Sequence, residues 1–331
     1  MEVFDRTQLK KLYRPESDSS NEDNGQVTII GGSKLFHGAP LLSLKIASRI
    51  VDMVFFASPE PSLESIVQKL KSKLFSFIWI PWEDVDAYIE KSDAVLIGPG
   101  MMRYRSEKRE VIRDMKDKGF NKKNLSLITY YLSRNKNLDL EGKKTREITK
   151  RLLTKFPYKR WVIDAGSLQV MELEWIPKCA IITPNEKEYE MLFKGKIPQK
   201  VHASQSMKSK RDDETGVASL PVSSNVERMA KKYKCVIVAK GPETIVCSAE
   251  KCMLVKGGNA GLTKGGSGDI LAGLTVALLA KNDPFFAVCS ASYIVKAAAD
   301  ELYKKVGTNY NADDLAERIP EILHGLLKTA L

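Results

Sequence analysis

The chain reads KGGNAGLTKGGSGDILAG over residues 256–273, the most informative stretch of the sequence. Its glycine turn comes directly before an apolar run that predicts a helix over residues 269–280. Unpaired backbone N–H groups and the helix dipole both favour negative charge at a helix N-terminus. Glycine carries no Cβ, so a phosphate can approach the backbone closely. An anion-binding turn is therefore predicted at four residues, Gly265, Gly266, Ser267 and Gly268.

Asp269 follows this turn at the expected start of the helix. One interpretation makes it a carboxylate of the first helical turn, stabilised by the helix dipole. The other makes it a general base held beside a bound phosphate. The density of glycines alone does not separate the two interpretations.

Short apolar runs alternate with amphipathic stretches outward from this turn. The β-branched run at residues 26–30 ends in two glycines and a serine, and residues 40–50 have helical spacing. Further strands are predicted at residues 53–57, 94–97, 161–163, 180–182 and 236–239. Strands that alternate with helices predict an α/β fold with a mostly parallel, doubly wound sheet covered on both faces.

The C-terminal third changes this rhythm. Residues 244–247 and 252–255 flank a polar turn and predict a hairpin near the sheet edge. The apolar spacing then predicts two more helices, over residues 284–305 and 312–331.

We expect one domain over residues 26–331. Residues 1–25 are polar and predict an arm that is either poorly ordered or an initial helix. Residues 194–224 are polar and lysine-rich with little periodicity, which predicts a mobile loop. We favour a surface insertion for this loop, and a lid over the active site is the alternative.

The composition is that of an ordinary globular protein. Hydrophobic residues make up 43% and charged residues 28% of the 331 residues, which argues against a disordered or fibrous chain. The longest apolar runs fall short of the roughly 18 residues that span a bilayer. The N-terminus has no apolar core after a basic start, unlike a secretory signal. We therefore expect no membrane span and a cytoplasmic location.

The net charge of +11 is concentrated in one region. Residues 103–160 hold 19 Lys and Arg against 7 Asp and Glu, so the rest of the chain is close to neutral. A solvated helical face is the interpretation we favour, followed by attraction of an anionic small substrate. Nucleic-acid binding is the one we favour least, because no aromatic residues are interleaved for base stacking.

Cysteine and histidine give no sign of a transition-metal site. The five cysteines show no CxxC spacing, and we expect them to be small buried hydrophobic residues. The three histidines are not spaced with another ligand in a recognisable pattern.

Residues 258–273 closely resemble the signature of the NAD(P)H-hydrate dehydratases, the YjeF C-terminal-like branch of the ribokinase-like kinases. Further family motifs follow in the family's order, and the resemblance runs from about residue 20 to the C-terminus. They are Ile30-Gly31-Gly32-Ser33 with Gly38-Ala39, Gly98-Pro99-Gly100, Asp164-Ala165, Thr183-Pro184-Asn185-Glu186-Lys187-Glu188, Lys240-Gly241-Pro242-Glu243-Thr244 and Asp283-Pro284-Phe285.

This resemblance implies a ribokinase-like three-layer α/β/α domain that repairs hydrated nicotinamide cofactors. Such an enzyme is a lyase: it phosphorylates the C6 hydroxyl of (S)-NAD(P)H hydrate with ADP or ATP and Mg²⁺, and loss of phosphate restores NAD(P)H. The family further implies a homo-oligomer, commonly a tetramer. Many relatives carry a fused epimerase domain for which this chain has no room, so we expect a separate epimerase.

The resemblance also implies roles for individual residues. Asp269 is the catalytic base and also contacts the substrate. The nucleotide is expected to bind at Lys240, Gly241, Pro242, Glu243, Thr244, Gly265, Gly266, Ser267 and Gly268. The hydrate pocket is expected to be lined by Ala39, Gly100 and Asn185, with Glu188 holding Mg²⁺ through phosphate.

Several of these positions have a purely structural alternative. Asn185 and Glu188 have the spacing of a helix capping box, so they either cap a helix or face the substrate and its metal-bound phosphate. Ala39 and Gly100 are alternatively a helix-packing residue and a turn residue. The stretch from Lys240 follows a strand, where ligands of open α/β sheets bind, and is alternatively a plain exit from that strand.

Two positions depart from the family's pattern. The last small residue of its GPGLG-type turn is Met102 here, which alters one wall of the expected pocket. The second carboxylate of its DAD element is replaced by Gly166, which puts binding of substrate or metal in doubt. Two other functions therefore stay open: a kinase of another small hydroxylated metabolite, such as a thiazole or pyrimidine vitamin precursor, and a non-catalytic nucleotide-binding protein.

Overall fold

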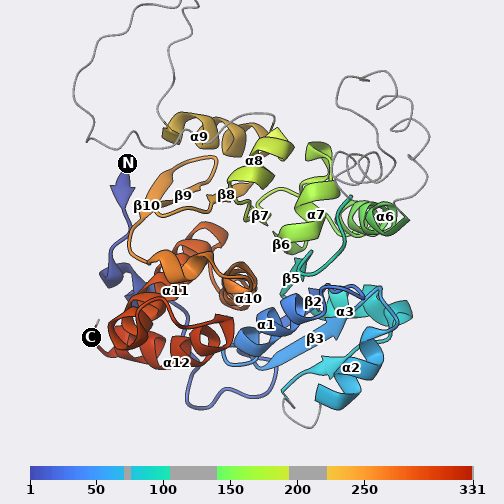
Figure 1. Cartoon of the computed structure of the whole chain (residues 1–331), viewed down its shortest axis with the longest axis horizontal. Coiled ribbons are helices and arrows are strands. Elements are labelled where there is room, and N and C mark those ends of the chain that lie inside the picture. The colour runs from blue at the N-terminus through green and yellow to red at the C-terminus, as the bar shows by residue number, and fades with distance from the viewer. Residues whose placement is uncertain (71–75, 105–139, 194–221, 330–331) are drawn as a thin grey trace, which may run out of the picture.

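The computed structural model describes residues 1–70, 76–104, 140–193 and 222–329. Within these ranges a single, mostly parallel sheet lies between two layers of helices (Figure 1). The predicted loop at residues 194–224 and the basic stretch at 103–160 fall largely outside the described residues. The α/β class and the covering of both sheet faces, predicted from the alternating pattern, are confirmed.

Ten strands form the sheet in the order β1-β10-β9-β8-β7-β6-β5-β2-β3-β4. Their bounds are β1 Glu2–Val3, β2 Gln26–Ile30, β3 Met53–Ala57, β4 Ile78–Trp79, β5 Ala94–Ile97, β6 Arg160–Ile163, β7 Ile181–Ile182, β8 Val236–Ala239, β9 Thr244–Cys247 and β10 Cys252–Val255. The strands from β8 to β4 in this order are all parallel, whereas β9 is antiparallel to both its neighbours. The sequence missed only the two-residue strands β1 and β4, which are too short to show periodicity.

Helices connect the strands and cover both faces (Figure 1). The α-helices are α1 Gly38–Ala47, α2 Leu63–Leu70, α3 Val85–Lys91, α6 Leu140–Lys155, α7 Ala165–Val170, α8 Glu186–Phe193, α9 Val222–Tyr233, α10 Ser267–Leu279, α11 Pro284–Val306 and α12 Ala312–Thr329. Short 3-10 helices are η1 Arg6–Lys11, η2 Trp82–Asp84, η4 Leu173–Trp175 and η5 Ala260–Thr263.

Two hydrophobic cores lie on opposite faces of the sheet. One core packs α1, α10, α11 and α12 against the sheet, and the other packs α3, α6, α8 and α9. Along β3, Val54 and Phe56 belong to the first core, whereas Phe55 and Ala57 belong to the second. Because successive side chains of a strand point to opposite faces, this continuous apolar run is typical of a sheet buried on both sides.

The N-terminal arm is part of the folded unit. β1 pairs in parallel with β10 at the edge of the sheet, and η1 follows it. Phe4, Leu9 and Leu12 are buried in the first core. Three apolar side chains therefore anchor a segment that is otherwise polar, and its elements are a short strand and a 3-10 helix.

The predicted hairpin is confirmed as β9 and β10, and it corrects one expectation. Cys247 and Cys252 are directly opposite each other in this hairpin and form a disulfide, so they are not merely buried hydrophobic residues. Cys235 and Cys289 are buried as expected, whereas Cys179 is exposed. The strand register decides the pairing, and sequence spacing alone does not reveal that register.

The described part of the basic stretch forms contacts within the fold. On α6, Arg151 and Lys155 both pair with Asp86 of α3, at 2.9 and 2.8 Å. Arg146 stacks over the ring of Trp175 at 4.6 Å. This part of the stretch therefore attaches α6 to its neighbours. Of the helices in the described ranges, none combines the length and the apolar character that crossing a bilayer requires.

Candidate active site

The loops that follow the parallel strands lie together at the carboxyl ends of those strands, on one side of the sheet. This is where open α/β sheets bind ligands. The backbone N–H of Gly32, after β2, donates to the carbonyl of Pro99, after β5, at 2.8 Å. The N–H of Gly166, after β6, donates to the carbonyl of Gly98 at 3.2 Å. The family motifs quoted from separate parts of the chain are thus brought into contact.

Two glycines of the loop after β5, Gly98 and Gly100, leave no space for a side chain. Gly98 has a φ of 120°, and a Cβ there would lie 1.8 Å from the carbonyl oxygen of Asp164. Gly100 has a φ of 71°, and a Cβ there would lie 2.1 Å from the carbonyl oxygen of Phe36. Both φ values are costly for other residues, and both clashes are with backbone atoms that cannot turn aside. Gly100 therefore packs directly against the loop that leads into α1.

The predicted glycine turn forms the N-terminus of α10. Gly266 is the N-cap with a φ of 94°, and the helix begins at Ser267. Ser267 Oγ donates to the carbonyl of Leu262 at 2.6 Å, which holds the turn in place. Within the described residues, the backbone N–H groups of Gly268 and Asp269 have no hydrogen-bond acceptor. Unpaired N–H groups at a helix N-terminus can bind an anion, so the geometry fits the expected phosphate turn.

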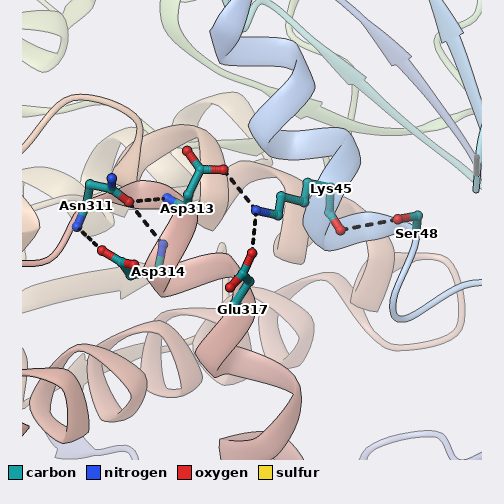
Figure 2. A network of polar contacts seen from close by, with 6 residues as sticks. All are labelled: Lys45, Ser48, Asn311, Asp313, Asp314 and Glu317. Carbon is teal, nitrogen blue, oxygen red and sulfur yellow. Dashed lines mark hydrogen bonds and ion pairs between the residues drawn. The ribbon is translucent and has the colours of Figure 1, made fainter. Parts of the chain in front are cut away.

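The turn is also held from behind by α1 and α12. A Cβ on Gly266 would lie 2.6 Å from Leu42 of α1 and 2.7 Å from Ala312 of α12. Figure 2 shows that Lys45 of α1 reaches Asp313 and Glu317 of α12, at 2.9 and 3.1 Å. These ion pairs hold the two helices together beside the glycine turn.

Asn311 fixes the start of α12 in the same network (Figure 2). Its Oδ1 accepts hydrogen bonds from the N–H groups of Asp313 and Asp314, at 2.8 and 3.0 Å. Its own N–H donates to Asp314 Oδ2 at 2.8 Å. This reciprocal cap satisfies N–H groups that a helix start leaves unpaired.

Asp269 lies in the first turn of α10, close to the start of α1. Ser43 Oγ donates to the carbonyl oxygen of Asp269 at 2.8 Å and lies 3.5 Å from that of Ala39. A Cβ on Gly273 would lie 2.4 Å from the carbonyl oxygen of Ser43, so α1 and α10 are in close contact. Ser43 therefore links the backbone of Asp269 to the first turn of α1, where Ala39 lies.

A buried ion pair lies beside the glycine turn. Lys240 Nζ is 2.9 Å from Asp164 Oδ1, and the Asp164 side chain is only 3% exposed. The hydroxyl of Thr183 donates to the same carboxylate oxygen at 2.6 Å. A Cβ on Gly268 would lie 3.6 Å from Lys240 Nζ, so the lysine adjoins the turn. Lys240 and the turn thus place positive charge at one point.

Burial and neighbouring charges shift the pKa values in this cluster. Burial raises the pKa of Asp269 from 3.8 to about 7, and the Asp164 carboxylate adds to the rise, whereas Lys240 opposes it. Burial alone would lower the pKa of Lys240, but the carboxylates around it, Asp164 foremost, raise it. Within the described residues the carboxylate of Asp269 makes no ion pair. A carboxylate with a pKa near neutrality can act as a general base.

The capping box predicted at Asn185 and Glu188 is present at the start of α8. Asn185 Oδ1 accepts from the N–H of Glu188 at 3.0 Å, and Glu188 Oε2 accepts from the N–H of Asn185 at 2.9 Å. The other carboxylate oxygen of Glu188 accepts from Gln169 Nε2 at 2.9 Å. Burial raises the pKa of Glu188. The Lys240 ammonium opposes this rise, and the Asp164 carboxylate adds to it. The capping role therefore coexists with a place beside the charged cluster.

The carboxylates of this cluster are candidate ligands for Mg²⁺. Within the described residues, no three His, Cys, Asp or Glu side chains are grouped so as to hold a metal ion. Asp164 pairs with the ammonium of Lys240, and Glu188 and Asp269 act on the same ammonium electrostatically. Magnesium is usually bound by one or two carboxylates with phosphate oxygens and water completing its shell, and this cluster fits that arrangement.

The stretch Lys240 to Thr244 forms the turn from β8 to β9. Gly241 and Pro242 are exposed, and Thr244, which begins β9, is buried. The carbonyl of Pro242 accepts a hydrogen bond from Lys296 Nζ at 2.8 Å. The turn is therefore open to solvent on one side and attached to α11 on the other.

Of the two departures from the family's pattern, Gly166 has a structural explanation. A Cβ on Gly166 would lie 2.2 Å from the carbonyl oxygen of Met101, so no side chain fits there while the loop after β5 keeps this position. Met102 lines a small cavity together with Ser33 and Lys144, next to the loop after β2. The carboxylate is thus absent where two loops are in direct contact.

Comparison with known proteins identifies the family. Residues 140–321 match the family model described as NAD(P)H-hydrate dehydratase. The chain belongs to the NAD(P)H-hydrate dehydratase family. It is 29% identical to the bifunctional NAD(P)H-hydrate repair enzyme Nnr of Methanocaldococcus jannaschii, over 95% of this chain and 51% of that protein. It is 26% identical to the ADP-dependent (S)-NAD(P)H-hydrate dehydratase of Nitrosopumilus maritimus, over 96% and 95% of the two chains.

Solved structures support the fold of this NAD(P)H-hydrate dehydratase family member. A ribokinase-like superfamily protein from Enterococcus faecalis matches with a TM-score of 0.70 at 19% identity, over 98% of this chain and 96% of that chain. An ADP/ATP-dependent NAD(P)H-hydrate dehydratase from Bacillus subtilis, co-crystallised with ATP and Mg²⁺, matches with a TM-score of 0.66 at 19% identity, over 98% of both chains. The predicted ribokinase-like fold is confirmed. The chain spans about half the length of the bifunctional relatives it matches.

Sequence reasoning missed several residues of the site in this family member. Asp164 and Thr183 stood only inside quoted motifs, although the structure joins both to Lys240 in one cluster. Ser43, Gln169 and Lys296 gave no sequence signal at all. Each lies on a helix with an ordinary pattern, and each acts through a contact to a distant part of the chain.

Proposed function

We propose that this chain catalyses the ADP- or ATP-dependent dehydration of (S)-NAD(P)H hydrate to NAD(P)H. One observation carries the proposal: Asp269, with its pKa raised to about 7, stands in the first turn of α10 beside unpaired N–H groups and the Lys240 ammonium. The family to which the chain belongs and the names of its relatives supply the substrate class.

Asp269 would take the proton from the C6 hydroxyl of the hydrated ring as that oxygen attacks the terminal phosphoryl group. The unpaired N–H groups of the turn and the ammonium of Lys240 would stabilise the negative charge on the phosphoryl oxygens. The electron pair of the ring nitrogen would then expel phosphate from C6, which leaves a C=N⁺ double bond between the nitrogen and C6. Loss of a proton from C5 to solvent would restore the C5–C6 double bond of NAD(P)H and neutralise the nitrogen.

The remaining site residues receive supporting roles in this proposal. Gly265 to Gly268 and the turn from Lys240 to Thr244 would bind the nucleotide. Ala39, Gly100 and Asn185 would line the hydrate pocket. Mg²⁺ would be held by Glu188 or Asp164 together with phosphate oxygens, and would supply charge neutralisation. A homotetramer and a separate epimerase remain predictions, the first to be checked by measuring the mass in solution.

The test is recovery of the near-ultraviolet absorbance of NADPH from hydrated NADPH. Purified protein and Mg²⁺ are incubated with ADP, with ATP or with no nucleotide. Recovery that requires a nucleotide supports the proposal and identifies the donor. Nucleotide binding without recovery would contradict it, and would favour a kinase of another hydroxylated metabolite if phosphoryl transfer is found, or a non-catalytic nucleotide-binding protein if it is not.

A further inference from the structure

Lys296 is a buried lysine on α11 that no motif includes. Its side chain is almost wholly enclosed, at 6% exposure for the residue. Its Nζ donates to the carbonyl of Pro242 at 2.8 Å and to the carbonyl of Gly257 at 3.0 Å. These acceptors lie 54 and 39 residues away in sequence. One ammonium therefore joins the turn after β8 to the segment that leads into the glycine turn.

The segment around Gly257 depends on α11 for its shape. Gly257 and Gly258 have φ values of 96° and 80°, so the backbone turns sharply there. One helical turn beyond Lys296, Asp300 Oδ2 accepts from the N–H of Gly258 at 2.9 Å, and its Oδ1 accepts from Asn259 Nδ2 at 3.1 Å. Asp300 thus binds the segment 257–259, whereas Lys296 binds both this segment and the turn from Lys240 to Thr244.

We propose that Lys296 is a positioning residue of the nucleotide site, which orders the turn from Lys240 to Thr244 and the segment 257–259 relative to each other before the nucleotide binds. This inference rests on the proposed function, because both segments are assigned to nucleotide binding there or lead directly into it. Ordering a loop in its bound conformation improves affinity, since the entropy of fixing it is not lost on binding. Lys296 contacts neither reacting atoms nor Asp269.

The charge of Lys296 gives the inference a pH dependence. Burial lowers the pKa of Lys296 to about 8, and the carboxylates of Asp300 on α11 and Glu243 in the turn oppose this effect. A charged ammonium makes stronger hydrogen bonds to carbonyl oxygens than a neutral amine does. The link between the two segments is therefore strong below about pH 8 and weakens as the lysine loses its proton above it.

The test compares Lys296→Met with Lys304→Met. Lys304 lies on the same helix, is exposed and pairs with Glu301 at 2.7 Å, so its variant removes the same charge without touching the two segments. In the nucleotide-free protein, amide hydrogen exchange should accelerate in both segments for Lys296→Met and stay unchanged for Lys304→Met. Calorimetry should show about tenfold weaker binding of ADP or ATP for Lys296→Met alone, with KM for the nucleotide raised and kcat changed by less than about threefold.

A pH titration of the unmodified protein needs no variant. Nucleotide affinity should fall between about pH 7 and about pH 9, and in Lys296→Met this fall should be absent. Hydrogen exchange that is unchanged in both segments would overturn the inference whatever the activity. If the unmodified protein bound neither ADP nor ATP, the proposed function and the positioning role would both be overturned, while the difference in hydrogen exchange would persist.

Discussion

Two lysines in this protein, one half-buried and one buried, have opposite pKa shifts. Lys240, on the turn after β8, is paired with Asp164 and surrounded by further carboxylates, which raise its pKa. Lys296, on α11, donates to two backbone carbonyls, and burial lowers its pKa to about 8. Burial acts in the same direction on both, so the charge of the partners decides the outcome.

The two surroundings suit different tasks. Around Lys240, carboxylates outnumber the single ammonium, and their mutual repulsion helps to raise the pKa of Asp269. Around Lys296 the hydrogen-bond partners are carbonyl dipoles, which hold the backbone without storing negative charge. The first region therefore has the electrostatics of a proton-transfer site, and the second has those of a structural joint.

The largest effect is expected from Asp269→Asn. An amide cannot accept the substrate proton, so turnover should fall by about 1,000-fold or more, while nucleotide affinity changes little. The measurement is absorbance recovery from hydrated NADPH alongside calorimetric binding of ADP and ATP.

Asp86→Asn is the matched control for this change. Asp86 lies in the first turn of α3 and pairs with Arg151 and Lys155 on the other core, away from the glycine turn. Its variant should retain full turnover. Appreciable turnover in Asp269→Asn would remove Asp269 from the role of base.

The next largest effect is expected from Lys240→Met. Losing one stabilising charge at the phosphoryl group should lower kcat/KM by about 100-fold at neutral pH. Because Lys240 opposes the pKa rise of Asp269, its loss should also shift the pH profile of kcat/KM. In the unmodified enzyme activity should increase as pH rises through about 7, where Asp269 loses its proton, and in Lys240→Met this increase should come at higher pH.

Asp164→Asn sharpens this test, because Asp164 raises the pKa of Asp269. In Asp164→Asn the increase of kcat/KM with pH should occur at lower pH than in the unmodified enzyme, which is opposite to the shift in Lys240→Met. Lys296→Met should leave the increase at the pH of the unmodified enzyme, since its surroundings do not include Asp269. A profile that shifts in the same direction in both Lys240→Met and Asp164→Asn would contradict the electrostatic account.

A smaller effect, on stability, is expected from Gly266→Ala. Gly266 has a φ of 94°, and the added Cβ would lie 2.6 Å from Leu42 and 2.7 Å from Ala312. The substitution should therefore lower the free energy of unfolding by about 3 kcal/mol. Gly265→Ala is the matched control, because a Cβ there meets no atom within 4 Å. Denaturant unfolding measures both. Equal free energies of unfolding for the two variants would show that α1 and α12 do not confine the glycine turn.

The smallest effect is a stability gain in Asp269→Asn at high pH. The pKa of Asp269 is about 7 in the folded protein against an ordinary value of 3.8. The folded state therefore holds this proton more tightly than the unfolded state, and stability falls as pH rises from about 4 to about 7. Asn carries no such proton, so the variant should be more stable than the unmodified protein by about 1–2 kcal/mol at about pH 8, discounted for partial exposure. The difference should vanish below about pH 4.

The sequence allowed most of the fold and the candidate base to be predicted, but few of the contacts between loops. The runs at Gln26–Ile30, Val236–Ala239 and the β9–β10 hairpin were predicted with their observed bounds, because apolar patterning reflects burial on a sheet. The disulfide between Cys247 and Cys252 was not, because it depends on the register of the hairpin. The conservative expectation for Asn185 and Glu188 as a capping box was correct, since that motif is local.

Local patterns in the sequence were enough to predict most of the strands, the glycine turn at the start of α10 and the aspartate that follows it, because each depends on residues within a few positions of one another. Only tertiary packing brings Lys240 to Asp164, partly buries Asp269 so that its pKa rises to about 7, and lets Lys296 join two segments. These features depend on the order of strands in the sheet and on which helices cover it. Electrostatic and hydrogen-bond interactions act over a few ångströms of space, whatever the separation along the chain.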